Sequence, residues 1–131
     1  MIVDTSAWVE FLRGTLSPTC LFVRDNLEGS LRITGTIQME LLAGAKNAQQ
    51  LLELQSLLVI PELLPTHEED FENAARLYRV CRRNGVTIRT MSDCLIAATA
   101  IRSSVPILHN DRDFALLAQH TELQVVDPTQ G

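Results

Sequence analysis

Long apolar runs are missing from this sequence of 131 residues. Its unbroken apolar stretches last only a few residues, whereas a membrane-spanning helix needs about 20. The first residues, Met1-Ile2-Val3-Asp4, have neither the basic start nor the apolar core of a signal peptide. We therefore expect a cytoplasmic protein.

Residues that form disulfides or bind zinc are also scarce. There are three cysteines and three histidines, namely Cys20, Cys81, Cys94, His67, His109 and His120. An odd number of widely separated cysteines argues against a disulfide scaffold and against a CxxC metal site. The histidines lack the spacing of zinc ligands. We expect Cys94 to be a small packing residue and His109 to be a partly buried structural residue.

Lysine is almost absent, since Lys46 is the only one among 11 basic residues and the others are arginines. The net charge of −5 argues against a nucleic-acid binder if only the sum is considered. If four of the 16 acids shared one metal site, the remaining 12 would nearly balance the 11 bases. Arginine binds phosphate in a bidentate manner, so this composition leaves RNA as a possible partner.

Apolar and turn-forming segments alternate in a pattern typical of strands followed by helices. With 46% apolar residues, the chain predicts one domain over residues 1–131. Strands are expected at residues 1–3, 31–34, 58–61, 105–109 and 123–126. Helices are expected at residues 7–13, 18–28, 35–42, 47–57, 67–85, 93–103 and 111–119. Their expected N-terminal caps are Thr5-Ser6, Ser17, the Thr66/Glu69 capping box and Ser92. This alternation predicts an α/β fold with a mostly parallel sheet covered on both faces.

Asp93 stands out because helical spacing places it on the same face as Ile96 and Ala97. That face should be buried, and a buried carboxylate costs several kcal/mol unless a metal, a cation or hydrogen-bond donors meet it. Taken alone, Asp93 is better explained as a residue that binds the first amides of its own helix.

Three more acids are expected at the same edge of the sheet. Asp4 directly follows the first strand, Asp111 follows the fourth, and Glu40 lies in the helix after the second. Ligands of such sheets bind beyond the carboxyl ends of the strands. Each acid has an ordinary structural role by itself, but four acids at one edge favour a shared site.

Clustered carboxylates repel one another, and a divalent cation removes that penalty. Oxygen ligands without histidine or cysteine favour Mg²⁺ or Mn²⁺. Such ions, held by carboxylates and water, commonly serve phosphoryl chemistry. The sequence therefore indicates metal-assisted hydrolysis of a phosphodiester.

Four motifs in order along the chain resemble those of PIN-domain ribonucleases of the VapC type, the toxins of bacterial toxin–antitoxin pairs. They are Val3-Asp4-Thr5-Ser6-Ala7-Trp8, Glu40-Leu41-Leu42-Ala43-Gly44, Ser92-Asp93-Cys94-Leu95-Ile96-Ala97-Ala98 and Asn110-Asp111-Arg112-Asp113-Phe114. The resemblance implies a PIN-like three-layer domain with a mostly parallel five-stranded sheet.

The resemblance also assigns roles to residues. It implies Asp4, Glu40, Asp93 and Asp111 as the catalytic, metal-binding acids. It implies that Asp113 is an auxiliary acid and that Ser6 makes a polar contact with the site. Asn110 stands where the family more often has threonine or serine, which affects a secondary hydrogen bond and not the metal site.

The implied activity is Mg²⁺- or Mn²⁺-dependent cleavage of tRNA or another structured RNA, leaving a 5′-phosphate and a 3′-hydroxyl. The implied partner is a VapB-like antitoxin whose C-terminal segment enters a groove formed by the first helices, and the family commonly dimerises. Trp8, Phe11 and Leu12 share one side of the first helix, where core packing and this groove explain them about equally well.

Arg76, Arg79 and Arg83 recur along one face of the long helix, and we expect a solvated face there. Arg89 is different because it stands close to Asp93, so we expect it to contact RNA.

Two other functions compete with this interpretation. Phosphatases with an aspartyl nucleophile usually have a second acid two residues later, but Ser6 occupies that position and Lys46 is the only lysine. A non-catalytic RNA-binding or scaffold module predicts an incomplete set of acids, whereas the set here is complete.

Overall fold

Four short parallel strands lie in the order β3-β2-β1-β4 in the computed structural model, which describes residues 1–129. The strands are β1 (Ile2–Val3), β2 (Arg32–Ile33), β3 (Glu62–Leu63) and β4 (Ile107–Leu108). The helices are α1 (Thr5–Arg13), α2 (Pro18–Asp25), α3 (Gly35–Ala43), α4 (Ala48–Leu57), α5 (Glu68–Arg83), α6 (Met91–Ser103) and α7 (Arg112–His120).

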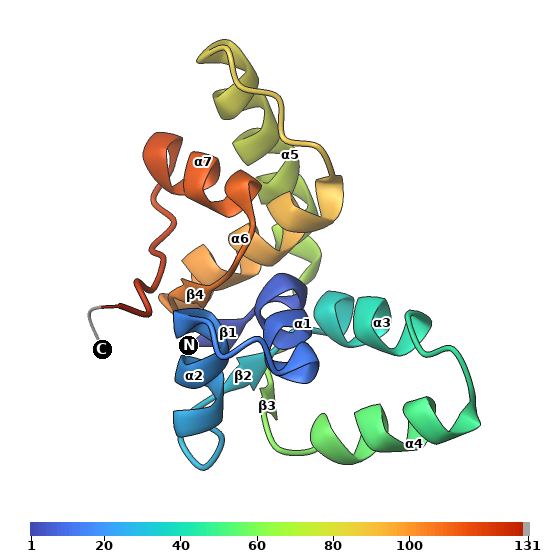
Figure 1. The fold of residues 1–131 in the computed structure, drawn as a ribbon. Helices are drawn as coiled ribbons and strands as arrows, with labels where there is room; N and C mark the ends of the chain where they lie inside the picture. The colour runs from blue at the N-terminus through green and yellow to red at the C-terminus, as the bar shows by residue number, and fades with distance from the viewer. Residues whose placement is uncertain (130–131) are drawn as a thin grey trace.

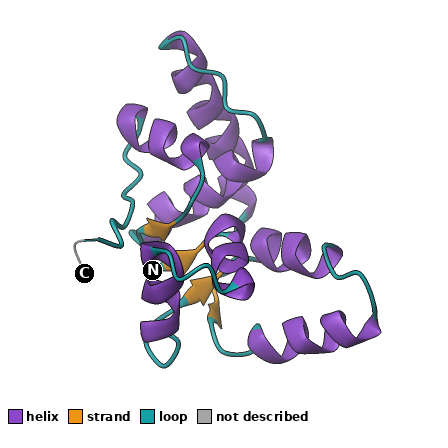
Figure 2. Ribbon diagram, in the orientation of Figure 1, coloured by secondary structure: helices purple, strands orange, loops and turns teal. Residues whose placement is uncertain are grey.

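Strand β1 is central, because Ile2 pairs with Arg32 of β2 on one side and with Ile107 of β4 on the other. The apolar side chains of β1 and β4 are fully buried, as expected for strands that are covered on both faces. The strands are only two residues long, and Figure 2 shows them at the junction of the surrounding helices.

Helices cover the sheet in two groups. Helices α5, α6 and α7 pack on one another and form the upper part of Figure 1, whereas α1–α4 lie around and below the sheet. The chain adds β2 and β3 in turn on one side of β1, and it then crosses back over the sheet to add β4 on the other side of β1. Right-handed crossovers therefore place the two groups on opposite faces. Within residues 1–129, no helix combines the length and the apolar character that crossing a bilayer requires.

The expected fifth strand is wrong, since residues 123–126 make only one bridge, from Val125 to Ile107. The third strand is also displaced. Residues 58–61, expected to be the strand, form the turn after α4, where Val59 is 80% exposed. Pro61 has no backbone N–H, and pairing starts just after it, where the Glu62 amide donates to the Leu31 carbonyl.

Three helix starts also differ from the expected ones. The N-terminal caps are Asp4 for α1 and Thr90 for α6, and the capping box of α5 joins His67 to Asp70. In each case a neighbouring polar residue, one or two positions away from the expected one, makes the cap. The Ser17 cap of α2 is confirmed, but this helix ends at Asp25, with Asn26 as its C-terminal cap, before Gly29.

Buried Asp70 joins α5 to α6. Its carboxylate accepts from Arg102 Nε (2.9 Å) and Nη2 (3.1 Å), from Thr99 Oγ1 (3.2 Å) and from the His67 amide (2.8 Å). Arg102 Nη2 also donates to the Pro65 carbonyl at 2.8 Å. Burial alone would raise the pKa of Asp70, but the bonds from Arg102 and His67 outweigh it and lower the pKa.

We predict that Asp70→Ala destabilises the fold by about 3 kcal/mol at neutral pH, because it strands Arg102 and the His67 amide. The lowered pKa means that this stabilisation is complete above the unfolded value of 3.8 and is lost as the pH falls through the folded pKa. Urea unfolding of both proteins should show the difference shrinking in acid. Asp25→Ala, which removes an exposed ion pair with Arg24, should cost less than about 1 kcal/mol. A similar cost for both variants would contradict this account.

Candidate metal centre

Asp4 is held at the carboxyl end of the central strand and is only 3% exposed. Its backbone amide continues the ladder by donating to the Leu108 carbonyl at 3.0 Å. Its Oδ2 accepts from the amide of Ser6 at 3.1 Å and from Ser6 Oγ at 2.7 Å. The same carboxylate therefore caps α1 and projects from the edge of the sheet.

Asp111 and Asp113 open helix α7 just beyond β4. Asp111 caps this helix, since its Oδ1 accepts from the Asp113 amide at 2.9 Å. Asp113 lies in the first turn and is 1% exposed. The strand and the cap thus direct two carboxylates to the edge where Asp4 lies.

Asp93 completes a compact group. It lies in the first turn of α6, is 9% exposed, and its amide donates to the capping Thr90 Oγ1 at 3.4 Å. One carboxylate oxygen from each of Asp93, Asp111 and Asp113 lies within 4.8 Å of the others, a spacing that can hold a metal ion. Asp113, expected as an auxiliary acid, is therefore a full member of the tightest cluster.

Glu40 lies to one side of this trio. It is half-buried on α3, and its Oε1 accepts from Thr5 Oγ1 at 3.2 Å. Glu40 and Asp4 are not members of the compact trio. Electrostatic coupling connects them to it, because the charge of Asp4 raises the pKa of Glu40 and also that of Asp93.

Repulsion and burial raise three of these pKa values. Burial, followed by the charges of Asp4 and Asp111, raises the pKa of Asp93 to about 7. Burial also raises the pKa of Asp4 despite its bonds from Ser6, and the charge of Asp111 adds to the rise. Burial and Asp4 raise the pKa of Glu40. A divalent cation would relieve this accumulated negative charge.

Arg89 is the base that meets these acids. Its backbone N–H and its Nε both donate to Asp113 Oδ2 at 3.1 Å, and its Nη2 donates to Asp111 Oδ1 at 2.9 Å. The other oxygen of Asp113, Oδ1, is buried and has no hydrogen-bond donor within residues 1–129. A buried carboxylate oxygen without a donor suits a metal ligand. The residues present thus fit a divalent cation.

Ser6 and Asn110 connect the ends of β1 and β4. Ser6 Oγ donates to Asp4 and accepts from the Asn110 amide at 2.8 Å. The Asn110 side chain turns to Glu10 Oε1 instead, at 3.1 Å. Ser6 therefore makes the expected polar contact, and Asn110 contributes to it through its backbone.

His109 and Cys94 have structural surroundings. His109 Nδ1 accepts from the Asp111 amide at 3.1 Å, its ring lies 5.6 Å from that of Phe114, and burial lowers its pKa. Cys94 is fully buried, and burial raises the pKa of its thiol to about 12. Both observations fit the structural roles expected from the sequence.

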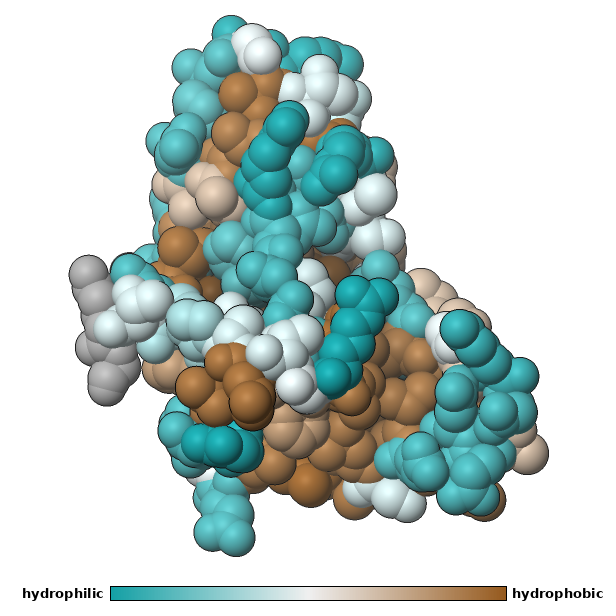
Figure 3. All heavy atoms as spheres, viewed as in Figure 1, coloured by the Kyte–Doolittle hydropathy of each residue, from teal (hydrophilic) through white to brown (hydrophobic). Residues whose placement is uncertain are grey.

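A groove runs beside the acids, between α1, α3 and α4, with a volume of about 410 Å³. Figure 3 shows apolar side chains gathered there. For Trp8 the sequence left core packing and such a groove as equal alternatives. Trp8 is wholly buried and packs edge-on against Phe11, which supports core packing. Leu12, 49% exposed, does line the groove, together with Val9 and Glu40.

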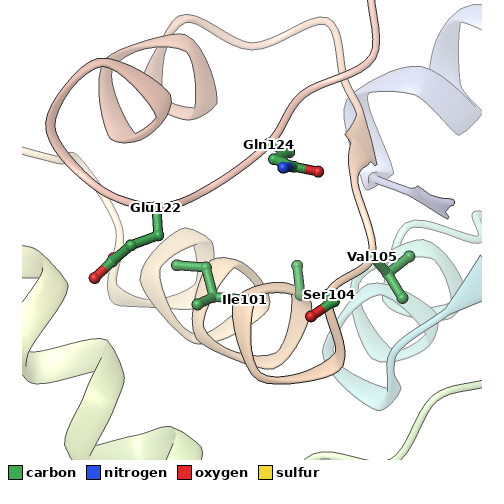
Figure 4. Close-up of a pocket in the computed structure, with 6 residues that line it drawn as sticks. Ile101, Ser104, Val105, Glu122 and Gln124 are labelled. Atoms are coloured by element: carbon green, nitrogen blue, oxygen red, sulfur yellow. The ribbon is translucent and has the colours of Figure 1, made fainter.

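A second cavity, of about 190 Å³, lies between the end of α6 and residues 122–124. Figure 4 shows Ile101, Ser104, Val105, Glu122 and Gln124 around it. Glu122 is its one charged residue, and the cavity is at the opposite end of α6 from Asp93. It lacks the convergent acids of the metal centre, which remains the candidate site.

Comparison with known proteins gives consistent results. The family model for the PIN domain matches residues 1–119. The VapC ribonuclease Mb1587 of Mycobacterium bovis and ribonuclease VapC11 of Mycobacterium tuberculosis are each 43% identical over 128 residues, covering 95% of this chain and 96% of the relative.

Solved structures show the same fold at lower identity. FitAcB from Neisseria gonorrhoeae has a TM-score of 0.77 and 22% identity, covering 99% of both chains. DNA-bound VapBC from Salmonella typhimurium has a TM-score of 0.78 and 17% identity, covering 97% of this chain and 96% of that one.

We predict that Asp93→Asn stabilises the metal-free protein at neutral pH. The folded pKa of Asp93 is about 7 against an ordinary value of 3.8, so the folded state holds this proton more tightly. The wild-type free energy of unfolding therefore loses this contribution as the pH rises from about 4 to about 7. Melting temperatures measured in EDTA should show the variant's advantage widening with pH. The control Asp25→Asn, at an exposed site, should show none, and an advantage independent of pH would refute the coupling.

Proposed function

The chain belongs to the PIN-domain family and, within it, to the VapC ribonucleases, and we propose from this that it is a metal-dependent endoribonuclease. One observation carries the proposal for this chain. Asp93, Asp111 and Asp113 converge within 4.8 Å beside Asp4, at the carboxyl edge of a parallel sheet. The proposed substrate is tRNA or another structured RNA, and the proposed role is that of the toxin in a toxin–antitoxin pair.

The proposed ligands of a Mg²⁺ or Mn²⁺ ion are Asp4, Glu40, Asp93 and Asp111, with Asp113 beside them. When bound, such an ion would neutralise charge on the phosphate and lower the pKa of a water molecule. Ser6 holds Asp4 in position, and Thr5 holds Glu40. Arg89 is 64% exposed beside the acids, so we assign it to the RNA phosphate next to the scissile bond.

The chemistry can be tested with a labelled tRNA pool. Wild-type protein with Mg²⁺ or Mn²⁺ should give discrete fragments with 5′-phosphate ends, and EDTA should abolish them. Asp93→Asn should cut at least about a hundredfold more slowly, since a lost ligand forfeits several kcal/mol of charge stabilisation. Asp25→Asn is the matched control and should cut like wild type.

Each alternative function has its own outcome in this experiment. Equal cutting by wild type and Asp93→Asn would remove the acids from the mechanism. RNA binding without cutting, with either metal, would favour the non-catalytic RNA-binding module. Release of inorganic phosphate from small monoesters, with RNA left intact, would favour the phosphohydrolase.

We also propose a VapB-like antitoxin as partner, with its peptide segment in the groove between α1, α3 and α4. The groove has an apolar floor that includes Val9, Leu12 and Leu54, and its wall includes Arg13. Because Glu40 also lines it, a peptide bound there would lie beside the metal centre. Homodimerisation and larger toxin–antitoxin complexes belong to the same proposal.

We predict that Leu12→Asp weakens the complex with the cognate antitoxin by about 2 kcal/mol, roughly thirtyfold, because it buries an unpaired charge in the groove. Titration of the antitoxin against RNA cleavage measures the effect, since the variant should remain active and become harder to inhibit. Val59→Asp changes an exposed side chain outside the groove and should be inhibited like wild type. Equal inhibition of both variants would exclude the groove.

A further inference from the structure

The charges of this protein are strongly segregated. Residues 73–92 contain no acid and five of the 11 basic residues, namely Arg76, Arg79, Arg82, Arg83 and Arg89. Since the whole chain carries −5, a segment of +5 leaves −10 on the rest. A polyanion that approaches the acids would be repelled by most of the molecule and attracted by this segment.

The segment leads to the metal centre. It consists of the second half of α5 and the connection to α6, which returns from the far end of α5 to the start of α6 (Figure 1). At its last arginine, Arg89, the segment contacts Asp111 and Asp113 directly. A positively charged segment therefore begins at the acids with Arg89 and continues, after the uncharged residues 84–88, along α5.

Most of this positive charge is available to a ligand. Arg79, Arg82 and Arg83 are exposed, and none forms an ion pair within the described part of the chain. The Arg82 guanidinium lies 5.6 Å from the Tyr78 ring, and Arg76 has a contact of 3.9 Å with Glu122. The sequence led us to expect only a solvated face here, because it could not show how few partners these side chains have.

The spacing suits a chain of phosphates. Arg76, Arg79 and Arg83 recur every three or four residues on one side of α5, which at 1.5 Å per residue spans about 10 Å. The six residues from Arg83 to Arg89 reach at most about 20 Å further. Such a band can meet several consecutive phosphates.

Neither the helix dipole nor an apolar ligand accounts for the whole arrangement. Favourable interaction with the dipole explains basic residues in the last turn of α5, Arg82 and Arg83, but neither Arg79 nor Arg89. A membrane or an apolar peptide would need an extended apolar surface, yet Met91 is the one large apolar side chain within residues 73–92 that is strongly exposed. Arginines with so few exposed apolar neighbours favour phosphate.

We propose that the arginine band, defined as Arg76, Arg79, Arg82, Arg83 and Arg89, binds the phosphate backbone of structured RNA beyond the cleavage site. The proposal rests on the nuclease function and adds the surface that holds the substrate. The band offsets the repulsion from the acids, and Arg89 directs the bound strand toward them.

The test compares variants of equal net charge. Arg79→Gln/Arg83→Gln removes two unpaired band residues, and Arg24→Gln/Lys46→Gln removes two charges elsewhere on the surface. Binding of the labelled tRNA pool in EDTA is measured over a range of salt concentrations, so no cleavage is needed. The band variant should lower the slope of log K against log salt by about 1.5, with a severalfold weaker affinity, while the control stays close to wild type.

A charge-conserving variant separates binding from folding. Arg79→Lys/Arg83→Lys keeps the charge and should therefore keep the wild-type slope of log K against log salt. If the two arginines had a purely structural role, the lysine variant should lose as much slope as the glutamine variant. Equal loss in the band and control variants would show a net-charge effect only and would overturn the proposal. Unchanged binding by the band variant, with wild-type cleavage intact, would overturn it while sparing the nuclease function. Wild-type protein that neither binds nor cuts RNA would refute both.

Discussion

Burial and mutual repulsion of carboxylates at one end of the sheet govern this structure. Burial, then the charges of Asp4 and Asp111, raises the pKa of Asp93 to about 7, and Asp4 also raises that of Glu40. The one base in contact with the group within residues 1–129, Arg89, forms ion pairs with Asp111 and Asp113 only. A fold has no structural reason to gather acids that it leaves so poorly compensated. A divalent cation bound between these carboxylates would offset the free energy lost to their repulsion.

The scaffold holds these acids in place by giving them second roles. Asp4 and Asp111 are helix caps, so backbone amides fix their carboxylates where repulsion would otherwise separate them. Asp93 lies in the first turn of α6, which Thr90 caps, and the buried pair of Asp70 and Arg102 joins the other end of this helix to α5. The free energy gained from these caps and from the Asp70–Arg102 pair thus offsets the repulsion between the clustered carboxylates.

The alternation of strands and helices placed Asp4 and Asp111 at one edge of the sheet, because residues that follow parallel strands share that edge. Glu40 and Asp93 were placed there by their positions in helices. Pairwise contacts were less accessible to the sequence. Pairing of the third strand starts only after Pro61, and Asp113 joins the cluster through the turn that Asp111 caps. For Trp8, periodicity left core and groove as equal alternatives, and only the packing of α1 decides for the core. The contact from Arg89 to Asp113 spans 24 residues, a distance over which periodicity carries no information.

The two proposed surfaces meet the acids from different elements. The groove reaches the site through Glu40 on α3, and the arginine band reaches it through Arg89, just before α6. A peptide in the groove would therefore cover an acid without covering Arg79 or Arg83. Inhibition and RNA retention become separable properties, since one depends on an apolar groove and the other on unpaired positive charge. Under these two proposals, a chain with an overall negative charge holds RNA beside a cluster of acids through a separate positive surface.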